Sequence, residues 1–151
     1  MREKQPARTY YSKVESPYQW STGETMGTFL TEMKDGPRLI SKRCQVCGKV
    51  FCPPQDYCEF CFQPMEEWVE VADRGSIKAW TRMMHYYPGM PCDLPFAYAS
   101  IQLEGADTCM VHIIRYSDLD SLNIDVEVEA VWKPEDEREG DIRDIDYFRL
   151  V

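Results

Sequence analysis

The chain has 151 residues, of which 44% are apolar and 28% are charged, and its formal net charge at pH 7 is −9. This length allows one domain with a hydrophobic core or two small modules, and the apolar fraction excludes a chain that is disordered throughout. The negative charge disfavours a nucleic-acid partner, because proteins gain most of their non-specific affinity for phosphates from lysine and arginine.

The composition also bears on the compartment. No apolar stretch reaches the roughly 20 residues that span a bilayer, and no apolar signal-peptide core follows the first residues. We therefore expect a cytoplasmic protein without a membrane partner. In that compartment the seven cysteines should be mostly reduced, and their odd number disfavours a complete set of disulfides.

Aromatic residues stand out in the polar N-terminal arm, residues 1–20. They are Tyr10, Tyr11, Tyr18 and Trp20. Exposed aromatics at this density are unfavourable in water unless they cover another surface. The arm therefore either packs on its own chain or lies on a partner subunit.

A helix is predicted directly after the arm. Ser21 followed by Glu24 is typical of a capping box, and Asp35-Gly36-Pro37 ends the pattern. One face of this helix carries four apolar side chains, Met26, Phe29, Leu30 and Met33. A single amphipathic helix is not stable in water, so this face must be buried on the following segments or on another chain.

Two C-x-x-C pairs predict a metal site. The pairs are Cys44/Cys47 and Cys58/Cys61, and ten residues separate them. Two short turns can thus present four thiolates to one tetrahedral ion, which is the closed arrangement of structural zinc. We expect one structural Zn²⁺ per chain and no open coordination position for catalysis.

Two further residues bear on this assignment. Gly48 directly follows the first pair and can adopt the positive φ that a tight knuckle turn often needs. Cys52 could replace one of the four ligands, but no C-x-x-C turn includes it. We therefore assign Cys52 to packing.

Short strands flank the first cysteine pair. Residues 39–43 lead into it and Val50-Phe51 leave it, as in a rubredoxin-like zinc ribbon. Such a module has little core, so the ion should supply much of its folding free energy, ~10–16 kcal/mol for comparable structural zinc sites.

Strand patterns dominate from about Met65 onward. The expected strands are Trp68–Val71, Ser76–Tyr87, Phe96–Leu103, Thr108–Tyr116, Val126–Trp132 and Ile142–Leu150. Residues 105–107 supply a tight hairpin turn between two of them. The expected fold class is mostly β, with an N-terminal arm and helix (1–36), a zinc ribbon (37–64) and a small five-stranded OB-fold barrel (65–151).

No catalytic residue is assigned. His112 shares one face of an expected strand with apolar neighbours, which is typical of a core histidine, and Cys109 points to the opposite face. His85 stands beside residues 86–95, a proline-rich apolar stretch that suits a binding loop better than catalysis.

Several runs of sequence carry a family resemblance. They are the expected helix, Arg43–Pro54, Tyr57–Cys61, Gly75-Ser76-Ile77, Pro95–Gly105, Leu122–Val128 and Tyr147-Phe148. In this order they resemble the zinc-ribbon/OB-fold family of acyl-CoA-associated proteins, over roughly residues 20–150. One departure is Asp125, where members of that family usually have a glycine.

The resemblance implies an accessory subunit. Such proteins typically assemble with thiolase-type catalytic subunits, or with hydratases, and help to form a channel for coenzyme A. The catalytic residues would then lie on the partner chain. Among known members, the chain looks most like subunits of thiolases that act on aromatic 3-oxoacyl-CoA in aromatic degradation, such as benzoylsuccinyl-CoA.

Coenzyme A carries anionic phosphates, so a site for it needs local cations. We name Lys49 and Arg82 as candidate contacts with CoA; the other cations considered are Lys42, Arg43, Arg74 and Lys78. Two rival functions stay open. One is an OB-fold nucleic-acid-binding module, against which the charge argues. The other is a stand-alone acyl-CoA hydrolase or thiol enzyme, which would act without a partner.

Overall fold

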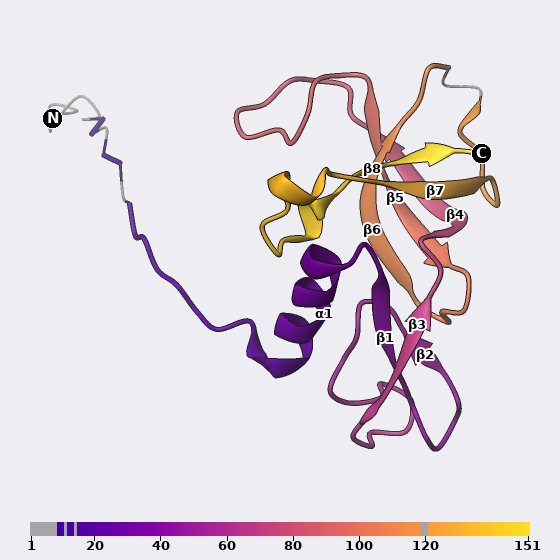
Figure 1. Cartoon of the computed structure of the whole chain (residues 1–151). Coiled ribbons are helices and arrows are strands. Elements are labelled where there is room, and N and C mark those ends of the chain that lie inside the picture. The colour runs from indigo at the N-terminus through magenta and orange to yellow at the C-terminus, as the bar shows by residue number, and fades with distance from the viewer. Residues whose placement is uncertain (1–8, 11, 14, 119–120) are drawn as a thin grey trace, which may run out of the picture.

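The computed structural model describes residues 9–10, 12–13, 15–118 and 121–151. Its elements are the helix α1 (Gly23–Asp35), the strands β1 (Leu39–Arg43), β2 (Val50–Phe51), β3 (Glu67–Val71), β4 (Arg74–Arg82), β5 (Phe96–Leu103), β6 (Cys109–Arg115), β7 (Glu127–Trp132) and β8 (Ile145–Leu150), and the short 3-10 helices η2 (Glu135–Glu137) and η3 (Ile142–Asp144). The helix, a three-stranded ribbon sheet and a closed barrel follow one another along the chain (Figure 1).

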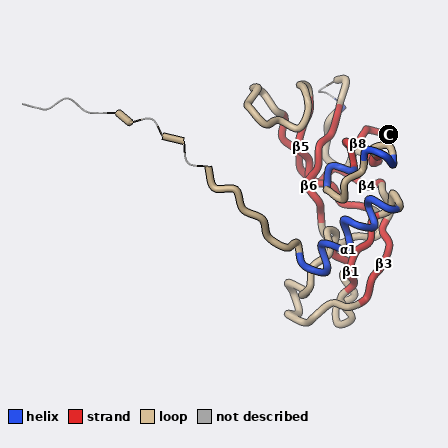
Figure 2. The backbone as a smooth tube through the Cα atoms, turned by 60° about the vertical axis from the view of Figure 1, so that its left-hand side comes forward, coloured by secondary structure: helices blue, strands red, loops and turns tan. Residues whose placement is uncertain are grey.

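Residues 15–20 of the N-terminal arm lead away from the body of the molecule in both views (Figure 1, Figure 2). Tyr18 and Trp20 are 71% and 72% exposed, and their ring centroids lie 4.9 Å apart. Packing of the arm on its own chain is therefore not observed for these residues, and Tyr11 lies outside the described part of the chain. Contact with a partner subunit stays a prediction.

Helix α1 forms in the segment where a helix was predicted, but its N-terminus is capped differently. The N-cap is Thr22, whose side chain makes no capping hydrogen bond, because its backbone is already helical (φ −70°, ψ −11°). The predicted capping box at Ser21 is therefore wrong; the Ser21 hydroxyl only accepts a hydrogen bond from the Gly23 N–H at 3.2 Å. None of the helices in the described part of the chain is long and apolar enough to cross a membrane.

The apolar face of α1 is buried within its own chain. Phe29 and Met33 are fully buried in one core cluster that also contains Leu39 of the ribbon and Phe148 of the barrel. This continuous core shows where the helix packs. It packs on the ribbon and the barrel together, and no second chain is needed to cover that face.

The ribbon sheet has the order β2-β1-β3. Strand β3 pairs with β1 over its whole length, from Leu39↔Val71 to Arg43↔Glu67. The segment 68–71, expected among the barrel strands, thus belongs to the ribbon. The division of the chain into three units stays a proposal, and this pairing moves its second boundary from residue 64 to the turn after Val71.

The barrel closes in the order β4-β5-β6-β8-β7, with β7 paired back to β4. This confirms the five-stranded OB-fold barrel. Strand β5 alternates regularly, with Ala97, Ala99 and Ile101 buried and the residues between them half-buried. Two expected strands are shorter than predicted by three residues, since β4 ends at Arg82 and β8 is preceded by the 3-10 helix η3; β6 and β7 are shorter by one or two residues.

Strand β2 joins the ribbon to the barrel because it forms hydrogen bonds on both edges. On one edge it pairs with β1. On the other, the Val50 N–H donates to Asp107 Oδ2 and the Val50 carbonyl accepts from the Asp107 N–H, both at 2.8 Å. The Thr108 hydroxyl accepts from the Cys52 N–H at 2.8 Å and donates to the Cys52 carbonyl at 3.0 Å. The turn between β5 and β6 therefore extends the ribbon sheet.

Gly75 marks the closest approach between strands β4 and β5. A Cβ atom at this position would lie 2.1 Å from the Gln102 carbonyl oxygen and 2.7 Å from Leu103 Cα, both backbone atoms. Since backbone in a closed barrel cannot shift cheaply, only glycine fits here.

We predict that Gly75→Ala lowers the free energy of unfolding by about 1–3 kcal/mol, as expected for overpacking of a well-packed site. Gly36→Ala is the control, because a Cβ there meets no atom within 4 Å and the backbone φ is −145°. Chemical denaturation of both variants measures the difference. Equal stability of the two variants would contradict the close approach.

Candidate metal centre and its surroundings

The four predicted ligands come together. The Sγ atoms of Cys44, Cys47, Cys58 and Cys61 all lie within 4.8 Å of one another. Cys44 and Cys58 are buried, Cys61 is half-buried and Cys47 is exposed. We refer to these four residues as the cysteine cluster.

Two turns of the same design present the cluster. In the first, the Cys44 N–H donates to the Lys49 carbonyl and the Gly48 N–H to the Cys44 carbonyl, both at 2.8 Å. In the second, the Cys58 N–H and the Phe62 N–H make the corresponding bonds, to Gln63 and Cys58, both at 2.9 Å. Each turn therefore places two sulfurs on the same side.

Each knuckle turn needs one residue at positive φ. Gly48 has φ 76°, as predicted, and the corresponding residue of the second turn is Phe62, with φ 54°. Sequence reasoning missed Phe62, because a bulky residue in this conformation is rare. Its position four residues after Cys58, matching Gly48 after Cys44, was the available signal.

The cluster fits a tetrahedral ion. Zinc–thiolate bonds of about 2.3 Å place neighbouring sulfurs of a tetrahedron about 3.8 Å apart. The Sγ atoms of Cys47 and Cys58 lie 3.7 Å apart, and the Cys61 N–H points at Cys58 Sγ at 3.4 Å. Four soft thiolate donors with an N–H directed at a sulfur can thus hold a metal ion, and four protein ligands leave no open position.

The pKa values of the thiols show why a cation suits the cluster. A hydrogen bond from the Cys47 backbone lowers the pKa of Cys44 to about 7. For Cys61, the neighbouring Cys47 sulfur and burial raise the pKa to about 12. Four thiolates this close repel one another, so they ionise together only around a positive ion.

Cys52 lies outside the cluster. Its side chain is buried in the main core beneath the β2–barrel junction, and burial raises its pKa to about 11. A neutral, buried thiol of this kind behaves as a small apolar group. The geometry thus accords with its assignment to packing.

Lys42 is not available to a ligand, contrary to its place among the cations considered. Its ammonium donates to the Thr25 hydroxyl at 2.7 Å and to Asp56 Oδ1 at 3.3 Å, and lies 4.9 Å from the centroid of the Trp68 ring. The Thr25 hydroxyl in turn donates to Asp56. Hydrogen bonds from Thr25 and then Lys42 hold the pKa of Asp56 below its usual value.

The two named CoA candidates lie far apart. Lys49 directly precedes β2, and its ammonium lies 5.0 Å from the centroid of the Phe60 ring. Arg82 is exposed and is the last residue of β4. The first residue of β4, Arg74, pairs with Glu104, in the turn that contacts β2. The eight steps from Arg74 to Arg82 span about 26 Å of strand. The two side chains therefore cannot hold the same phosphate group.

Three of the remaining cations are engaged in ion pairs on the surface. Arg43 pairs with Glu67 at 3.8 Å, Arg74 with Glu104 at 3.0 Å and Lys78 with Asp125 at 2.6 Å. Within the described part of the chain, no ion pair is found for Lys49 or Arg82.

His112 is a core residue, as predicted. It is buried, its Nε2 lies 3.2 Å from the Ile142 carbonyl oxygen, and its ring packs edge-on against Phe148. Burial lowers its pKa, so it is neutral at pH 7. Cys109 is exposed on the opposite face of β6, and the two do not form a nucleophile–base pair.

The loop of residues 83–95 between β4 and β5 exposes apolar side chains, as expected of a binding loop. They are Met84, Tyr86, Tyr87 and Leu94, exposed by 57%, 74%, 40% and 39%. Asp93 is the only aspartate, glutamate, lysine or arginine in this loop. The loop projects from the barrel beyond β4 and β5 (Figure 1).

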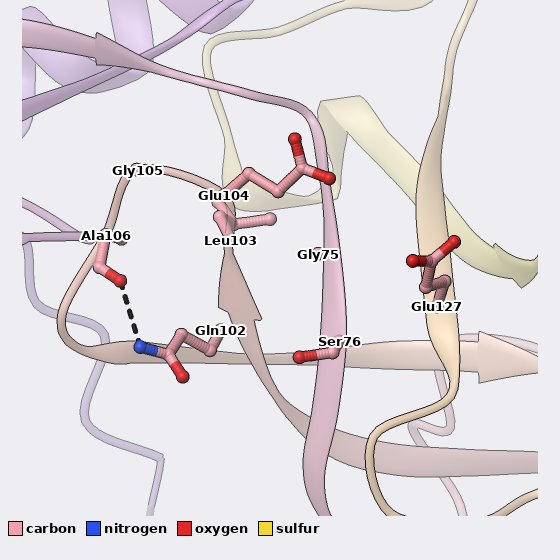
Figure 3. A pocket seen from close by; sticks show the side chains of 8 residues that line it. All are labelled: Gly75, Ser76, Gln102, Leu103, Glu104, Gly105, Ala106 and Glu127. Atoms are coloured by element: carbon pink, nitrogen blue, oxygen red, sulfur yellow. Dashed lines mark hydrogen bonds between the residues drawn. The ribbon is translucent and has the colours of Figure 1, made fainter.

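A hollow of about 330 Å³ lies at the opposite end of β4 (Figure 3). Its lining includes the carboxylates of Glu104 and Glu127, and Gln102 Nε2 donates to the Ala106 carbonyl at 3.0 Å across its floor. None of its lining residues is cationic. This hollow is therefore unsuited to the phosphates of coenzyme A.

Comparisons with known proteins agree with this architecture. Residues 68–133 match the family model described as "ChsH2, C-terminal OB-fold domain". The fold is similar to that of a solved chain described as "Ltp2-ChsH2(DUF35) aldolase", with a TM-score of 0.59 and 22% identity, over 87% of this chain and 98% of that chain. It is also similar to a DUF35-family protein of unknown function from Sulfolobus solfataricus, with a TM-score of 0.62 and 18% identity over 85% of each chain. The expected resemblance to a zinc-ribbon/OB-fold family is confirmed.

We predict that purified protein contains about one zinc ion per chain, bound by the cysteine cluster. Cys58→Ser should lose this metal, because three thiolates cannot close the tetrahedral shell. Cys52→Ser, a matched control outside the cluster, should retain it. Elemental analysis measures both variants. Freshly purified protein without metal, or loss of metal in Cys52→Ser alone, would contradict the assignment.

Proposed function

We propose that this chain, whose barrel matches the ChsH2 C-terminal OB-fold domain, is an accessory subunit of a heteromeric enzyme that acts on acyl-CoA. The observation that carries the proposal is the likeness to nearly the whole of a chain described as part of an Ltp2-ChsH2 aldolase. The described residues fit this role. The four-cysteine cluster leaves no open coordination position on a metal, and Cys109 and His112 do not form a nucleophile–base pair. Catalysis would then be carried out by the partner.

The proposed metal is Zn²⁺, held by Cys44, Cys47, Cys58 and Cys61. When bound, it supplies a cross-link between two short turns and no chemistry on a substrate. The chain's own contribution is positional. The β2 junction fixes the ribbon against the barrel, so the arm, the loop 83–95 and the barrel are presented to a partner in one orientation.

Our first choice of partner is a thiolase-type subunit acting on an aromatic 3-oxoacyl-CoA such as benzoylsuccinyl-CoA, as the sequence resemblance implies. An aldolase subunit is the second candidate, because the similar solved chain is described as an aldolase. The exposed apolar loop 83–95 and the aromatic arm are the surfaces proposed for contact. Both expose large side chains that a protein interface would cover.

We predict no turnover of acyl-CoA by the purified chain alone, and turnover after the catalytic subunit is added. Thiolysis of a 3-oxoacyl-CoA by free coenzyme A distinguishes a thiolase from an aldolase partner. It is measured as the loss of the 3-oxoacyl chromophore, with the gain of one thioester for each coenzyme A consumed. Turnover by this chain alone would favour the stand-alone acyl-CoA enzyme and contradict the accessory role.

Arg82 is the better of the two candidate CoA contacts. It is exposed and directly precedes the apolar loop 83–95. Among the described residues its side chain has no hydrogen-bond or ion-pair partner, whereas the Lys49 ammonium lies over the Phe60 ring. A guanidinium here can pair with a phosphate beside an apolar wall that suits the pantetheine arm.

We predict that Arg82→Met raises the KM for coenzyme A in the assembled complex by about tenfold, as expected from the loss of one charge-assisted hydrogen bond. Lys49→Met is the control and should leave the KM nearly unchanged. Steady-state kinetics with varied coenzyme A measures both. A KM that changes only in Lys49→Met would place the phosphates at the ribbon instead.

A further inference from the structure

The ammonium of Lys42 lies at a meeting point of three elements. Lys42 belongs to β1 and is 8% exposed, which is unusual for a lysine. Its partners are Thr25 in the first turn of α1, Asp56 in the loop before the second cysteine pair, and the Trp68 ring of β3. A buried ammonium requires such partners, because desolvation of the charge is otherwise unfavourable.

Both knuckle turns are directly connected to this network. Lys42 precedes Cys44 by two residues on β1, and Asp56 precedes Cys58 by two residues. The Asp56 carbonyl also accepts a hydrogen bond from the Met65 N–H at 2.8 Å, which closes the second hairpin. A change in either turn therefore displaces a partner of Thr25.

Thr25 is the helical member of the network. Its hydroxyl accepts from Lys42 and donates to Asp56, so both of its hydrogen-bonding functions are used. The rest of the helix is held by apolar contacts, mainly of Phe29 and Met33. The first turn of α1 is thus held to the ribbon by polar contacts to Lys42 of β1 and to Asp56 in the loop before the second cysteine pair.

We propose that the Thr25–Lys42–Asp56 network couples metal binding in the cysteine cluster to the docking of α1. Metal in the cluster orders both knuckle turns, which places Lys42 and Asp56 to receive Thr25. Conversely, docking of α1 stabilises the turns and raises the affinity for metal. Coupling between two sites is reciprocal, so each event changes the other by the same factor.

Zinc affinity and amide hydrogen exchange of α1 test this proposal in the isolated full chain. In the wild type, removal of zinc by a chelator should speed exchange in α1 by about fivefold or more, the lower range of typical coupling. Thr25→Val, which keeps the shape but loses the hydroxyl, should weaken zinc binding by a similar factor, measured by competition with a chromophoric chelator. In that variant, zinc should no longer slow exchange in α1.

Two controls separate the network from general destabilisation. Thr25→Ser keeps the hydroxyl and should behave as the wild type. Lys78→Met removes a surface ion pair, Lys78–Asp125 at 2.6 Å on the barrel, and should leave zinc affinity unchanged. If fast amide exchange in β5 and β6 shows that Thr25→Val is unfolded, Lys42→Met is used in its place, with the same expected loss of zinc affinity.

Either of two results would overturn the proposal. One is exchange in α1 that does not respond to zinc in the wild type. The other is a zinc affinity of Thr25→Val equal to that of Thr25→Ser and Lys78→Met. The second result would mean that metal orders the ribbon without acting on the helix through these contacts.

Discussion

Strand β2 links the ribbon to the barrel through hydrogen bonds on both of its edges. One edge of β2 pairs with β1. On the other edge Val50 bonds to Asp107, and Cys52, directly after β2, bonds to Thr108. A strand of two residues has few contacts of its own, so its position depends on the knuckle turn that ends at Lys49. The cysteine cluster therefore acts beyond the ribbon. We propose that a metal in the cluster, by holding the first turn, stabilises β2 and its hydrogen bonds to the turn between β5 and β6.

Sequence patterns predicted the parts of this structure that depend on local spacing. Cys44, Cys47, Cys58 and Cys61 were identifiable because four thiolates at these intervals serve one chemistry. The barrel was predicted from short segments that are rich in β-branched or aromatic residues and are bounded by turn residues. The cap of α1 was predicted incorrectly because Ser21 and Thr22 are both residue types found at N-caps, with serine the more favoured of the two. Only the backbone conformation decides between them.

The features that sequence reasoning missed depend on contacts between distant residues. Strand β3 has the same alternation whichever sheet it joins, so its pairing with β1 could not be foreseen. Lys42 has the pattern of an exposed strand lysine, and its burial depends on Thr25 and Asp56, which lie 17 and 14 residues away. The separation of Lys49 from Arg82 likewise follows from the direction of β4 and not from any motif.

Charge and exposure together favour a protein partner over a nucleic acid. The chain is acidic, and six cations in the described strands of the ribbon and barrel already face carboxylates: Lys42, Arg43, Arg74, Lys78, Arg115 and Arg149. Exposed aromatic and apolar groups lie in the arm, in the loop 83–95 with its single charged residue, and on the ribbon at Tyr57, Phe60 and Phe62. An OB barrel that binds single strands combines stacking aromatics with a basic groove, and the hollow at the end of β4 carries carboxylates instead.

The central claim is that this chain works as one subunit of an acyl-CoA enzyme. Affinity purification from the native source, followed by mass spectrometry of the intact assembly, tests it most directly. We expect the chain to be recovered with a thiolase-type or aldolase-type catalytic subunit, each copy of this chain carrying its zinc. Recovery of a lone monomer under conditions that preserve native complexes would contradict the account.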